Sequence, residues 1–260
     1  MSFQFDPNPA AAVLLQAWKA QQQMQALPSP IAPANLDSGY CVQDRLVDLT
    51  GQFVCGWKLG VGSLAAMMAA SAQRPLVGRL LSSRCYRDCD VVYLSKARPI
   101  TVEFEIVFTL ACDIEPYNEK PLERLVESAH VGFEFVLSRF VDRRAVGQPS
   151  FVADNVGFEA CVVGPRIEVE DIDNIASSVA VYVDGVEKGR GLHGDDATEP
   201  WGSLQRLLEH ASARGLTLKR GDVVFTGAAA KPIVIEHESF ELSANFLGRK
   251  LCVSAKISDA

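Results

Sequence analysis

The chain has 260 residues, of which 48% are hydrophobic, so it can bury a substantial core as one large domain or as a domain with an appendage. Its formal net charge of −7 and the lack of a basic cluster argue against nonspecific nucleic-acid binding. The sequence shows neither an apolar run that would span a bilayer nor a secretory signal, so we expect no membrane partner.

Two helices are predicted near the N-terminus. Residues 10–26 are rich in helix formers and have an apolar side with four-residue spacing. Three closely spaced prolines follow and end this helix. A second helix is expected over about 37–50, with Asp37 or Ser38 near its N-cap.

Strand patterns dominate from about residue 52 onward, because β-branched and aromatic residues gather in short runs. The expected strands are 91–94, 101–112, 161–164, 179–183, 186–191, 221–227, 232–236 and 250–257. Asp184 and Gly185 predict a hairpin turn between two of these strands. Two helices, over about 121–130 and 201–214, interrupt the series.

These elements indicate an α+β fold, because strands and helices do not alternate regularly as a doubly wound fold requires. We expect a mostly β domain with flanking helices. The predicted boundaries are a helical N-terminal section, residues 1–50, and a β-rich domain, residues 51–260.

The run TVEFEIVF, residues 101–108, places Glu103 and Glu105 in an otherwise apolar strand. Side chains alternate in direction along a strand, so these two carboxylates share one face. A half-buried strand with a solvated face explains the pattern without any function. A metal site is the alternative.

Glu134 lies in a second apolar run, VGFEFVLSRF, residues 131–140. A carboxylate in a central strand is costly unless it is protonated, paired or coordinated. Arg139 is one possible partner. If Glu134 instead joins Glu103 and Glu105, a hard divalent cation such as Mg²⁺ or Mn²⁺ relieves their repulsion.

Lys58 lies in GWKLGVGS, residues 56–63, whose glycine spacing matches no phosphate-binding loop. Its side chain can extend to the surface, or it can lie buried and move a proton or bind a carboxylate. His210 is expected to be exposed on a helix, and His193 lies in an acidic loop that either closes over a pocket or is simply solvated. No serine or cysteine has the setting of a hydrolase nucleophile. Scattered cysteines favour reduced thiols in a cytoplasmic protein.

Five segments of the chain, taken in their order along the sequence, resemble those of the hydratase/decarboxylase branch of the fumarylacetoacetate hydrolase superfamily. The resemblance extends across nearly the whole chain. Members include 2-oxopent-4-enoate hydratases and 4-oxalocrotonate decarboxylases. The segments that carry the resemblance are GWKLGVGS, VEFEIVF, FEFVLSRF, VADNVGFEACVVG and LKRGDVVFTGA. The glutamate in FEFVLSRF favours this branch, since the carbon–carbon hydrolase branch has an aspartate as third ligand and a separate histidine.

The resemblance implies a mixed β-sandwich or roll with an N-terminal helical section, usually in a homo-oligomer. It implies a metal-dependent lyase that acts on a 2-oxo or 2-hydroxy-dienoic acid in aromatic catabolism. The residues that it assigns are Lys58 as the active-site lysine, Glu103, Glu105 and Glu134 as ligands of Mg²⁺ or Mn²⁺, and Leu59, Gly60, Asp154 and Thr226 as substrate-binding residues.

Four positions depart from the family pattern. Leu76 replaces an acidic residue, Val156 and Gly157 replace serines, and Ala228 replaces a further serine. Two alternatives therefore stay open. One is a hydrolase or decarboxylase that acts on acylpyruvates such as oxaloacetate, and the other is a non-catalytic homologue that binds a small molecule.

Overall fold

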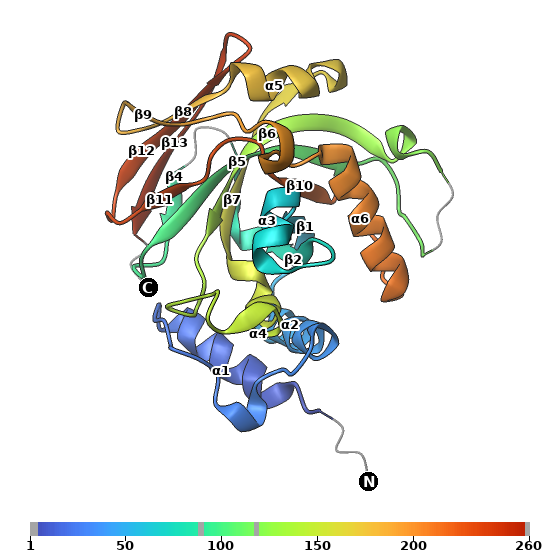
Figure 1. Ribbon diagram of the computed structural model, residues 1–260, viewed down its shortest axis with the longest axis vertical. Coiled ribbons are helices and arrows are strands. Elements are labelled where there is room, and N and C mark those ends of the chain that lie inside the picture. Colours follow the sequence, from blue (N-terminus) through green and yellow to red (C-terminus); the bar gives the residue numbers. More distant parts are fainter. Residues whose placement is uncertain (1–4, 88–90, 117–119, 258–260) are drawn as a thin grey trace.

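Two β-sheets of unequal size form the centre of the protein, as Figure 1 shows for the computed structural model, which describes residues 5–87, 91–116 and 120–257. The strands are β1 (Val54–Gly60), β2 (Leu76–Leu81), β3 (Cys85–Arg87), β4 (Val91–Leu94), β5 (Ile100–Leu110), β6 (Val126–Val136), β7 (Phe158–Ile167), β8 (Ala180–Val183), β9 (Val186–Arg190), β10 (Val223–Ala228), β11 (Ile233–Ile235), β12 (Phe240–Phe246) and β13 (Arg249–Ile257). The larger sheet has the order β2-β1-β10-β5-β6-β7-β3, and β11 pairs with the beginning of β5. The smaller sheet has the order β4-β13-β12-β8-β9.

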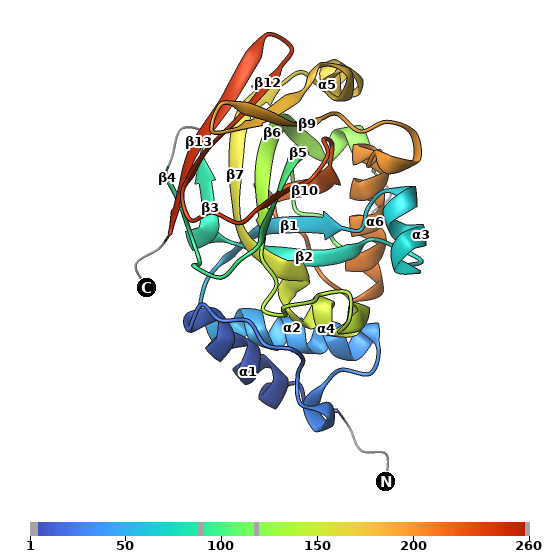
Figure 2. The same cartoon turned by 60° about the vertical axis from the view of Figure 1, so that its left-hand side comes forward.

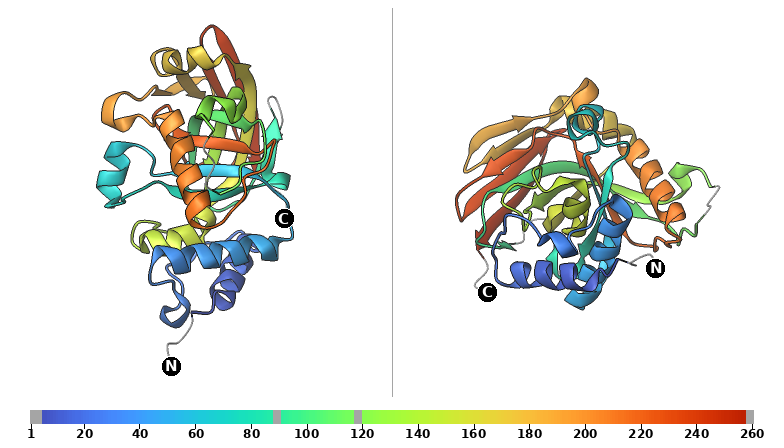
Figure 3. Two further views of the ribbon diagram at one scale, coloured as in Figure 1. Left: turned by 90° about the vertical axis from the view of Figure 1, so that its right-hand side faces the viewer. Right: turned by 60° about the horizontal axis from the view of Figure 1, so that its bottom comes forward.

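Helices lie below, to the right of and above the sheets in Figure 1, and the N-terminal ones lie together at one end of the molecule (Figures 1 and 3). They are α1 (Asn8–Lys19), α2 (Leu36–Thr50), α3 (Leu64–Ala70), α4 (Gly147–Ala153), α5 (Ile172–Ser178) and α6 (Pro200–Ala213). Within the described ranges, no helix is long and apolar enough to cross a membrane. The predicted α+β class, a curled mixed sheet with an N-terminal helical section, is confirmed.

Aromatic side chains fill the space between the two sheets. The ring of Phe104 on β5 lies 5.8 Å from Phe133 on β6 and 6.0 Å from Phe246 on β12, measured between ring centroids. Along β13 the alternating residues Leu251 and Val253 point into the same core. Each such buried side chain contributes roughly 2 kcal/mol through the hydrophobic effect, so this layer holds the two sheets together.

The N-terminal helices pack against the other face of the larger sheet. Leu14 of α1 and Leu46 of α2 are fully buried there, together with Phe158 and Phe225 from the sheet. Gln43 on α2 donates hydrogen bonds to backbone carbonyls of β2 and α4, each at 3.0 Å. The helical section therefore shares a core with the sheet, and a domain boundary at residue 50 stays a prediction.

Most of the predicted strands are present, with ends that differ by a few residues. The run 101–112 is β5, and the short run 161–164 lies within the longer β7. Asp184 and Gly185 have positive φ angles of 50° and 77° between β8 and β9, as the predicted tight hairpin turn requires. The helix predicted over 201–214 is α6.

The helix predicted over residues 121–130 is wrong. Only Leu122–Arg124 form a 3₁₀ turn, and β6 begins at Val126. β6 pairs with β5 on one edge and with β7 on the other. These contacts between distant parts of the chain override the helical spacing of Leu122, Leu125 and Val126.

The first predicted helix is too long. α1 ends at Lys19 instead of continuing to residue 26, and Gln21 then adopts a left-handed conformation with a φ angle of 52°. Met24 lies beyond this turn. Its backbone N–H donates a hydrogen bond to the Arg139 carbonyl, and its own carbonyl accepts one from the Val141 N–H. Residues 20–26 therefore serve as a connection that is tied to the segment after β6.

The N-cap of α2 lies slightly before the two residues that were expected near it. Asn35, rather than Asp37 or Ser38, occupies the N-cap, and its side chain accepts a hydrogen bond from the Ser38 N–H at 2.9 Å. The Ser38 hydroxyl accepts from the Asn35 N–H at 3.2 Å. Together these two bonds form a capping box, which satisfies two otherwise free helix donors.

Candidate metal centre

Three glutamates converge on one face of the larger sheet. Glu103 on β5 lies directly opposite Glu134 on β6, and Glu105 follows two residues along the same face of β5. Each of the three offers a carboxylate oxygen within 4.8 Å of the others. Glu105 is fully buried, so the solvated-face interpretation is wrong for this residue, whereas Glu103 is half-buried. Glu134 is fully buried as well.

Burial and proximity make this arrangement unfavourable for charged carboxylates. Burial raises the pKa of Glu105 well above its usual range, and the neighbouring Glu134 and Glu103 raise it further. Burial also raises the pKa of Glu134, although the nearby Lys58 acts in the opposite direction. The cluster therefore needs a proton or an additional positive charge.

Lys58 supplies one positive charge from β1. It is 1% exposed, so the alternative in which it extends to the surface is wrong. Its Nζ lies 2.9 Å from Glu134 Oε1 and donates a hydrogen bond to the Val156 carbonyl at 3.1 Å. One ammonium group balances only part of the charge of three carboxylates.

The curl of the larger sheet makes the contact between Lys58 and Glu134 possible. β1 and β6 are separated by β10 and β5, which would place them about 14 Å apart in a flat sheet. Figure 2 shows β1 and β2 running across the direction of β5, β6 and β7. This curvature brings a long side chain from one part of the sheet to the carboxylates of another.

The oxygen atoms of the cluster fit a divalent cation. Glu105 Oε2 accepts a hydrogen bond from the Gly227 N–H at 2.7 Å. Glu105 Oε1 and both carboxylate oxygens of Glu134 are buried and accept no well-aligned hydrogen bond from the described residues, despite the short ion pair with Lys58. Buried carboxylate oxygens without donors suit a hard cation such as Mg²⁺ or Mn²⁺.

A strained turn brings a backbone carbonyl to Lys58. Asn155, Val156 and Gly157 have positive φ angles of 51°, 53° and 68°, and a β-branched residue rarely adopts this conformation. The Asn155 side chain fixes the turn, because it accepts from the Arg79 N–H and donates to the Arg79 carbonyl, both at 2.8 Å. Such strain is characteristic of functional sites, and here it directs the Val156 carbonyl toward Nζ.

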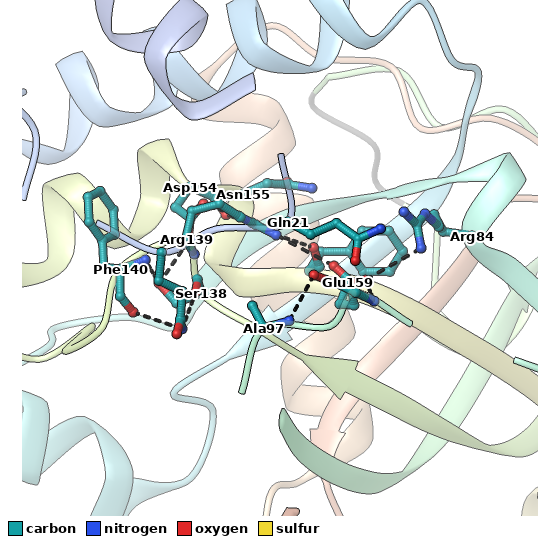
Figure 4. A network of polar contacts seen from close by, with 12 residues as sticks. Gln21, Arg84, Ala97, Ser138, Arg139, Phe140, Asp154, Asn155 and Glu159 are labelled. Carbon is teal, nitrogen blue, oxygen red and sulfur yellow. Dashed lines mark hydrogen bonds and ion pairs between the residues drawn. The ribbon is translucent and has the colours of Figure 1, made fainter. Parts of the chain in front are cut away.

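Arg139 supports this turn and pairs with Asp154 instead of Glu134. Its guanidinium Nε contacts Asp154 Oδ1, and its backbone N–H donates to Asp154 Oδ2 at 2.8 Å (Figure 4). The Ser138 hydroxyl donates to the same oxygen, also at 2.8 Å. Both carboxylate oxygens of Asp154 thus hold the strained turn in place. The assignment of Asp154 to substrate binding stays a prediction.

The other predicted substrate-binding residues lie beside the carboxylates or the lysine. Thr226 is buried and donates its hydroxyl hydrogen bond to the Ile106 carbonyl at 2.8 Å. Leu59 is buried, and Gly60 faces the Val156 side chain, which a Cβ at Gly60 would approach to 2.8 Å. Contact of these residues with a substrate stays a prediction.

Several residues at the site received no role from the sequence. Gly78 lies opposite Lys58 in β2, where a Cβ would lie 2.8 Å from Lys58 Cδ. The Gly227 N–H and the Val156 carbonyl act through the backbone, so their residue types carry no direct signal. A glycine inside a strand was the available sign of the close approach at Gly78.

The four departures from the family pattern lie in this same region. Leu76 pairs with Gly60, and Ala228 pairs with Glu105. Val156 and Gly157 belong to the strained turn. The surroundings of Lys58 and Glu105 are therefore more apolar than the family pattern implies.

The two histidines that the sequence singled out have different positions. His193 is exposed, but its loop reaches the site: a Cβ at Gly62 or Gly227 would lie 3.1 or 3.0 Å from the Thr198 side chain. The prediction that His210 is exposed is wrong, since it is only 4% exposed and its ring lies 4.6 Å from that of Tyr40. Burial lowers the pKa of His210 to about 3, and the Arg214 charge acts in the same direction.

Comparisons with known proteins agree with this geometry. The sequence profile of the family described as "Fumarylacetoacetate (FAA) hydrolase C-terminal" matches residues 67–249. The chain is 28% identical over 249 residues to 2-keto-4-pentenoate hydratase 2 of Dechloromonas aromatica (strain RCB), covering 93% of this chain and 95% of the relative. It is 29% identical over 195 residues to 2-hydroxyhexa-2,4-dienoate hydratase of Comamonas testosteroni, covering 73% of each chain.

A solved structure has a similar fold over nearly the whole chain. This is 4-oxalocrotonate decarboxylase from Pseudomonas putida G7, complexed with magnesium and adipate. The TM-score is 0.82 at 19% sequence identity, and the match covers 98% of this chain and 99% of the other. At this identity the likeness concerns the fold.

Proposed function

The chain belongs to the fumarylacetoacetate hydrolase family, and from this premise we propose that it is a divalent-metal-dependent lyase that acts on a 2-hydroxy-2,4-dienoic acid or its 2-oxo form. Hydration is the proposed reaction, because the relatives that align over most of the chain are named hydratases. Decarboxylation of a related acid is the second candidate, favoured by the fold of 4-oxalocrotonate decarboxylase. We also expect a cytoplasmic homo-oligomer.

The observation that carries the proposal is the convergence of Glu103, Glu105 and Glu134. Among the described residues, Glu105 Oε1 and both carboxylate oxygens of Glu134 have no well-aligned hydrogen-bond donor. In this proposal the three carboxylates hold Mg²⁺ or Mn²⁺. When bound, such a cation supplies a Lewis acid for the carboxylate and 2-oxygen of a 2-oxo acid. The magnesium in the decarboxylase structure supports a divalent ion of this kind.

Lys58 is the proposed acid–base residue. Its Nζ forms an ion pair with Glu134 Oε1 and donates a hydrogen bond to the Val156 carbonyl, and these two contacts fix its position. From there the ammonium group can bind an anionic substrate oxygen or transfer a proton during keto–enol interconversion. Leu59, Gly60, Asp154 and Thr226 are proposed to shape or support the substrate site around it.

The test compares Glu105→Gln with the unaltered protein. We expect the protein to consume 2-hydroxypenta-2,4-dienoate only with a divalent cation, as followed by loss of the diene absorbance. Glu105→Gln removes one anionic ligand and should lower this rate by about two orders of magnitude or more. Glu187→Gln is the matched control, because Glu187 is exposed on β9 and pairs with Arg190.

Two outcomes would change the assignment. Unchanged activity and metal affinity in Glu105→Gln would contradict the metal centre. Carbon dioxide release from 4-oxalocrotonate, without hydration of the dienoate, would favour the decarboxylase.

A further inference from the structure

Three cysteine side chains meet where the two ends of the larger sheet approach each other. Cys55 Sγ lies 3.0 Å from Cys85 Sγ, and Cys161 Sγ lies 3.2 Å from the same Cys85 Sγ. Both distances are shorter than the ordinary contact of two sulfur atoms. Cys85 is therefore the central member of a thiol triad, which we define as Cys55, Cys85 and Cys161.

The triad joins strands from the two ends of the sheet order. Cys55 belongs to β1, whereas Cys85 and Cys161 are direct partners in the parallel pair of β3 and β7. In the sheet order, β1 lies next to one end and β3 forms the other. Contact between Cys55 and Cys85 thus crosses the seam, which we define as the place where the two ends of the curled sheet approach each other without strand pairing among the described residues.

The triad also lies close to the carboxylate cluster. Cys161 is the cross-strand partner of Glu134, and Cys55 precedes Lys58 by three residues on β1. A bond between Cys55 and Cys85 would therefore tie β1, the strand that carries Lys58, to β3, whose partner β7 lies beside the strand of Glu134. This consequence follows from the strand positions alone.

We propose that the thiol triad is a redox-sensitive site at which Cys85 forms a reversible disulfide with Cys55, and that Cys161 is the alternative partner of Cys85. Cys55 and Cys85 are both partly exposed, so a small oxidant can reach them. A disulfide requires the paired sulfur atoms to approach by about 1 Å from the observed 3.0 Å contact.

Burial distinguishes a disulfide from a metal–thiolate site here. The hydrogen bond with Cys85, followed by burial, raises the pKa of the Cys55 thiol, which disfavours a cluster of thiolates. Burial likewise raises the pKa of the Cys161 thiol. A disulfide carries no charge, so it avoids both penalties.

Hydrogen peroxide supplies a balanced route. The hydrogen bond with Cys161 raises the pKa of the Cys85 thiol, so this thiol loses its proton only as its sulfur attacks one peroxide oxygen. The O–O bond breaks, sulfenic acid forms, and the released hydroxide takes up that proton as water. The Cys55 sulfur then attacks the sulfenic sulfur, the S–O bond breaks, and a second water leaves with the remaining proton. Two thiols are oxidised to one disulfide, and one peroxide is reduced to two waters.

The experiment maps the thiols of the reduced protein before and after treatment with hydrogen peroxide. Free thiols are capped, the chain is digested without reductant, and the peptides are identified by mass. We expect a peptide that joins Cys85 to Cys55 or to Cys161, and dithiothreitol should restore both thiols. Recovery of Cys85 without either cross-link, as a free thiol or as sulfinic acid, would overturn the proposal.

Cysteine variants locate the bond. Cys55→Ser should redirect the bond to Cys85 and Cys161, Cys161→Ser should keep it between Cys55 and Cys85, and Cys85→Ser should abolish both. Cys41→Ser is the matched control, because Cys41 is exposed on α2 and should leave the bond unchanged. An equal yield of cross-link between Cys55 and Cys161 in Cys85→Ser would contradict the central role of Cys85.

Thermal unfolding provides a readout that is independent of the proposed reaction. A bond between Cys55 and Cys85 closes a loop between residues that are 30 positions apart, so oxidation should raise the Tm by on the order of 5 °C. Reductant should reverse this rise. A bond that forms without any rise in Tm would contradict the locking of the seam.

Discussion

Lys58 is held in a buried position by the absence of a side chain on its neighbour. Gly78 lies opposite Lys58, and a Cβ there would lie 2.8 Å from Lys58 Cδ and 2.9 Å from the Asn155 carbonyl oxygen. The lysine stem fills the space that any other residue at position 78 would occupy. Its Nζ can therefore reach Glu134 only because a glycine stands at this position.

Gly78→Ala should reduce catalysis more than stability. The added methyl group must displace the lysine stem, and a displacement of about 1 Å at a catalytic group can cost on the order of 100-fold in turnover. Gly164→Ala is a matched control, because a Cβ there is equally crowded at 2.8 Å from Leu251 Cδ1. Turnover and urea unfolding should be measured for both variants. Equal losses of activity in Gly78→Ala and Gly164→Ala would contradict the prediction.

His210→Phe should reduce the loss of stability in acid. Burial lowers the pKa of folded His210 to about 3, whereas an unfolded histidine takes up a proton near pH 6.5. The unfolded state therefore binds more protons below pH 6.5, and stability falls as the pH decreases toward 3. Phenylalanine keeps the ring beside Tyr40 and does not titrate.

The contribution of His210 should be visible when the free energy of unfolding is compared at two pH values. Between pH 7 and pH 5, the free energy of unfolding should fall by up to about 2 kcal/mol less in His210→Phe than in the unaltered protein. Urea unfolding at both pH values measures this difference. His193→Gln, at an exposed position, should behave as the unaltered protein does, and identical pH profiles for all three proteins would refute the prediction.

Side chains at the site were easier to predict than the backbone groups that position them. Glu105, Glu134 and Lys58 stand out in the sequence because charged residues are rare in apolar runs. The Val156 carbonyl and the Gly227 N–H have no such signature, since every residue carries these groups. His210 was misjudged because a single histidine in a helical pattern does not reveal which side of the helix it occupies.

At the scale of elements, strands were predicted better than helix ends. The alternating residues of β13 identify a strand that is buried on one face. β6 lacks so clear a period at its beginning, and its identity depends on pairing with β5 and β7, which are distant in the sequence. The end of α1 likewise depends on backbone hydrogen bonds between Met24 and the segment after β6.

Asn35→Ala should destabilise the protein by about 1 kcal/mol. The Asn35 side chain accepts from the Ser38 N–H, and no alanine side chain can replace that acceptor at the first turn of α2. Asp37→Ala is the informative control, because Asp37 lies in the same turn and should contribute only a few tenths of a kcal/mol through the helix dipole. Urea unfolding gives both values, and a larger loss in Asp37→Ala would show that the cap has been assigned to the wrong residue.

At the scale of the whole molecule, the curl of the larger sheet converts separate strand patterns into one site. Lys58 and Glu134 come from strands separated by two others, so local sequence patterns do not reveal their contact. The resemblance to a family assigned both residues to one active site, but it did not predict that they form an ion pair. The apolar runs around these residues mark them one by one, and the curl of the sheet provides their common location.

Divalent cations should stabilise the entire fold if the three carboxylates bind them. A ligand that binds only the folded state at 100 times its Kd adds about 2.7 kcal/mol to the free energy of unfolding. For a chain of this length, Mg²⁺ should therefore raise the Tm by on the order of 5 °C, and oxalate should add to this rise as a mimic of the 2-oxo acid carboxylate.

Glu105→Gln should differ from the unaltered protein both in its Tm without metal and in the change of Tm that Mg²⁺ causes. Without metal the variant should unfold at a higher temperature than the unaltered protein, because it lacks a carboxylate whose charge is disfavoured first by burial and then by Glu134 and Glu103. With Mg²⁺ its Tm should scarcely change, whereas Glu187→Gln should show the full rise. Scanning fluorimetry with and without a chelator measures these shifts, and a full magnesium response in Glu105→Gln would mean that the cation binds elsewhere.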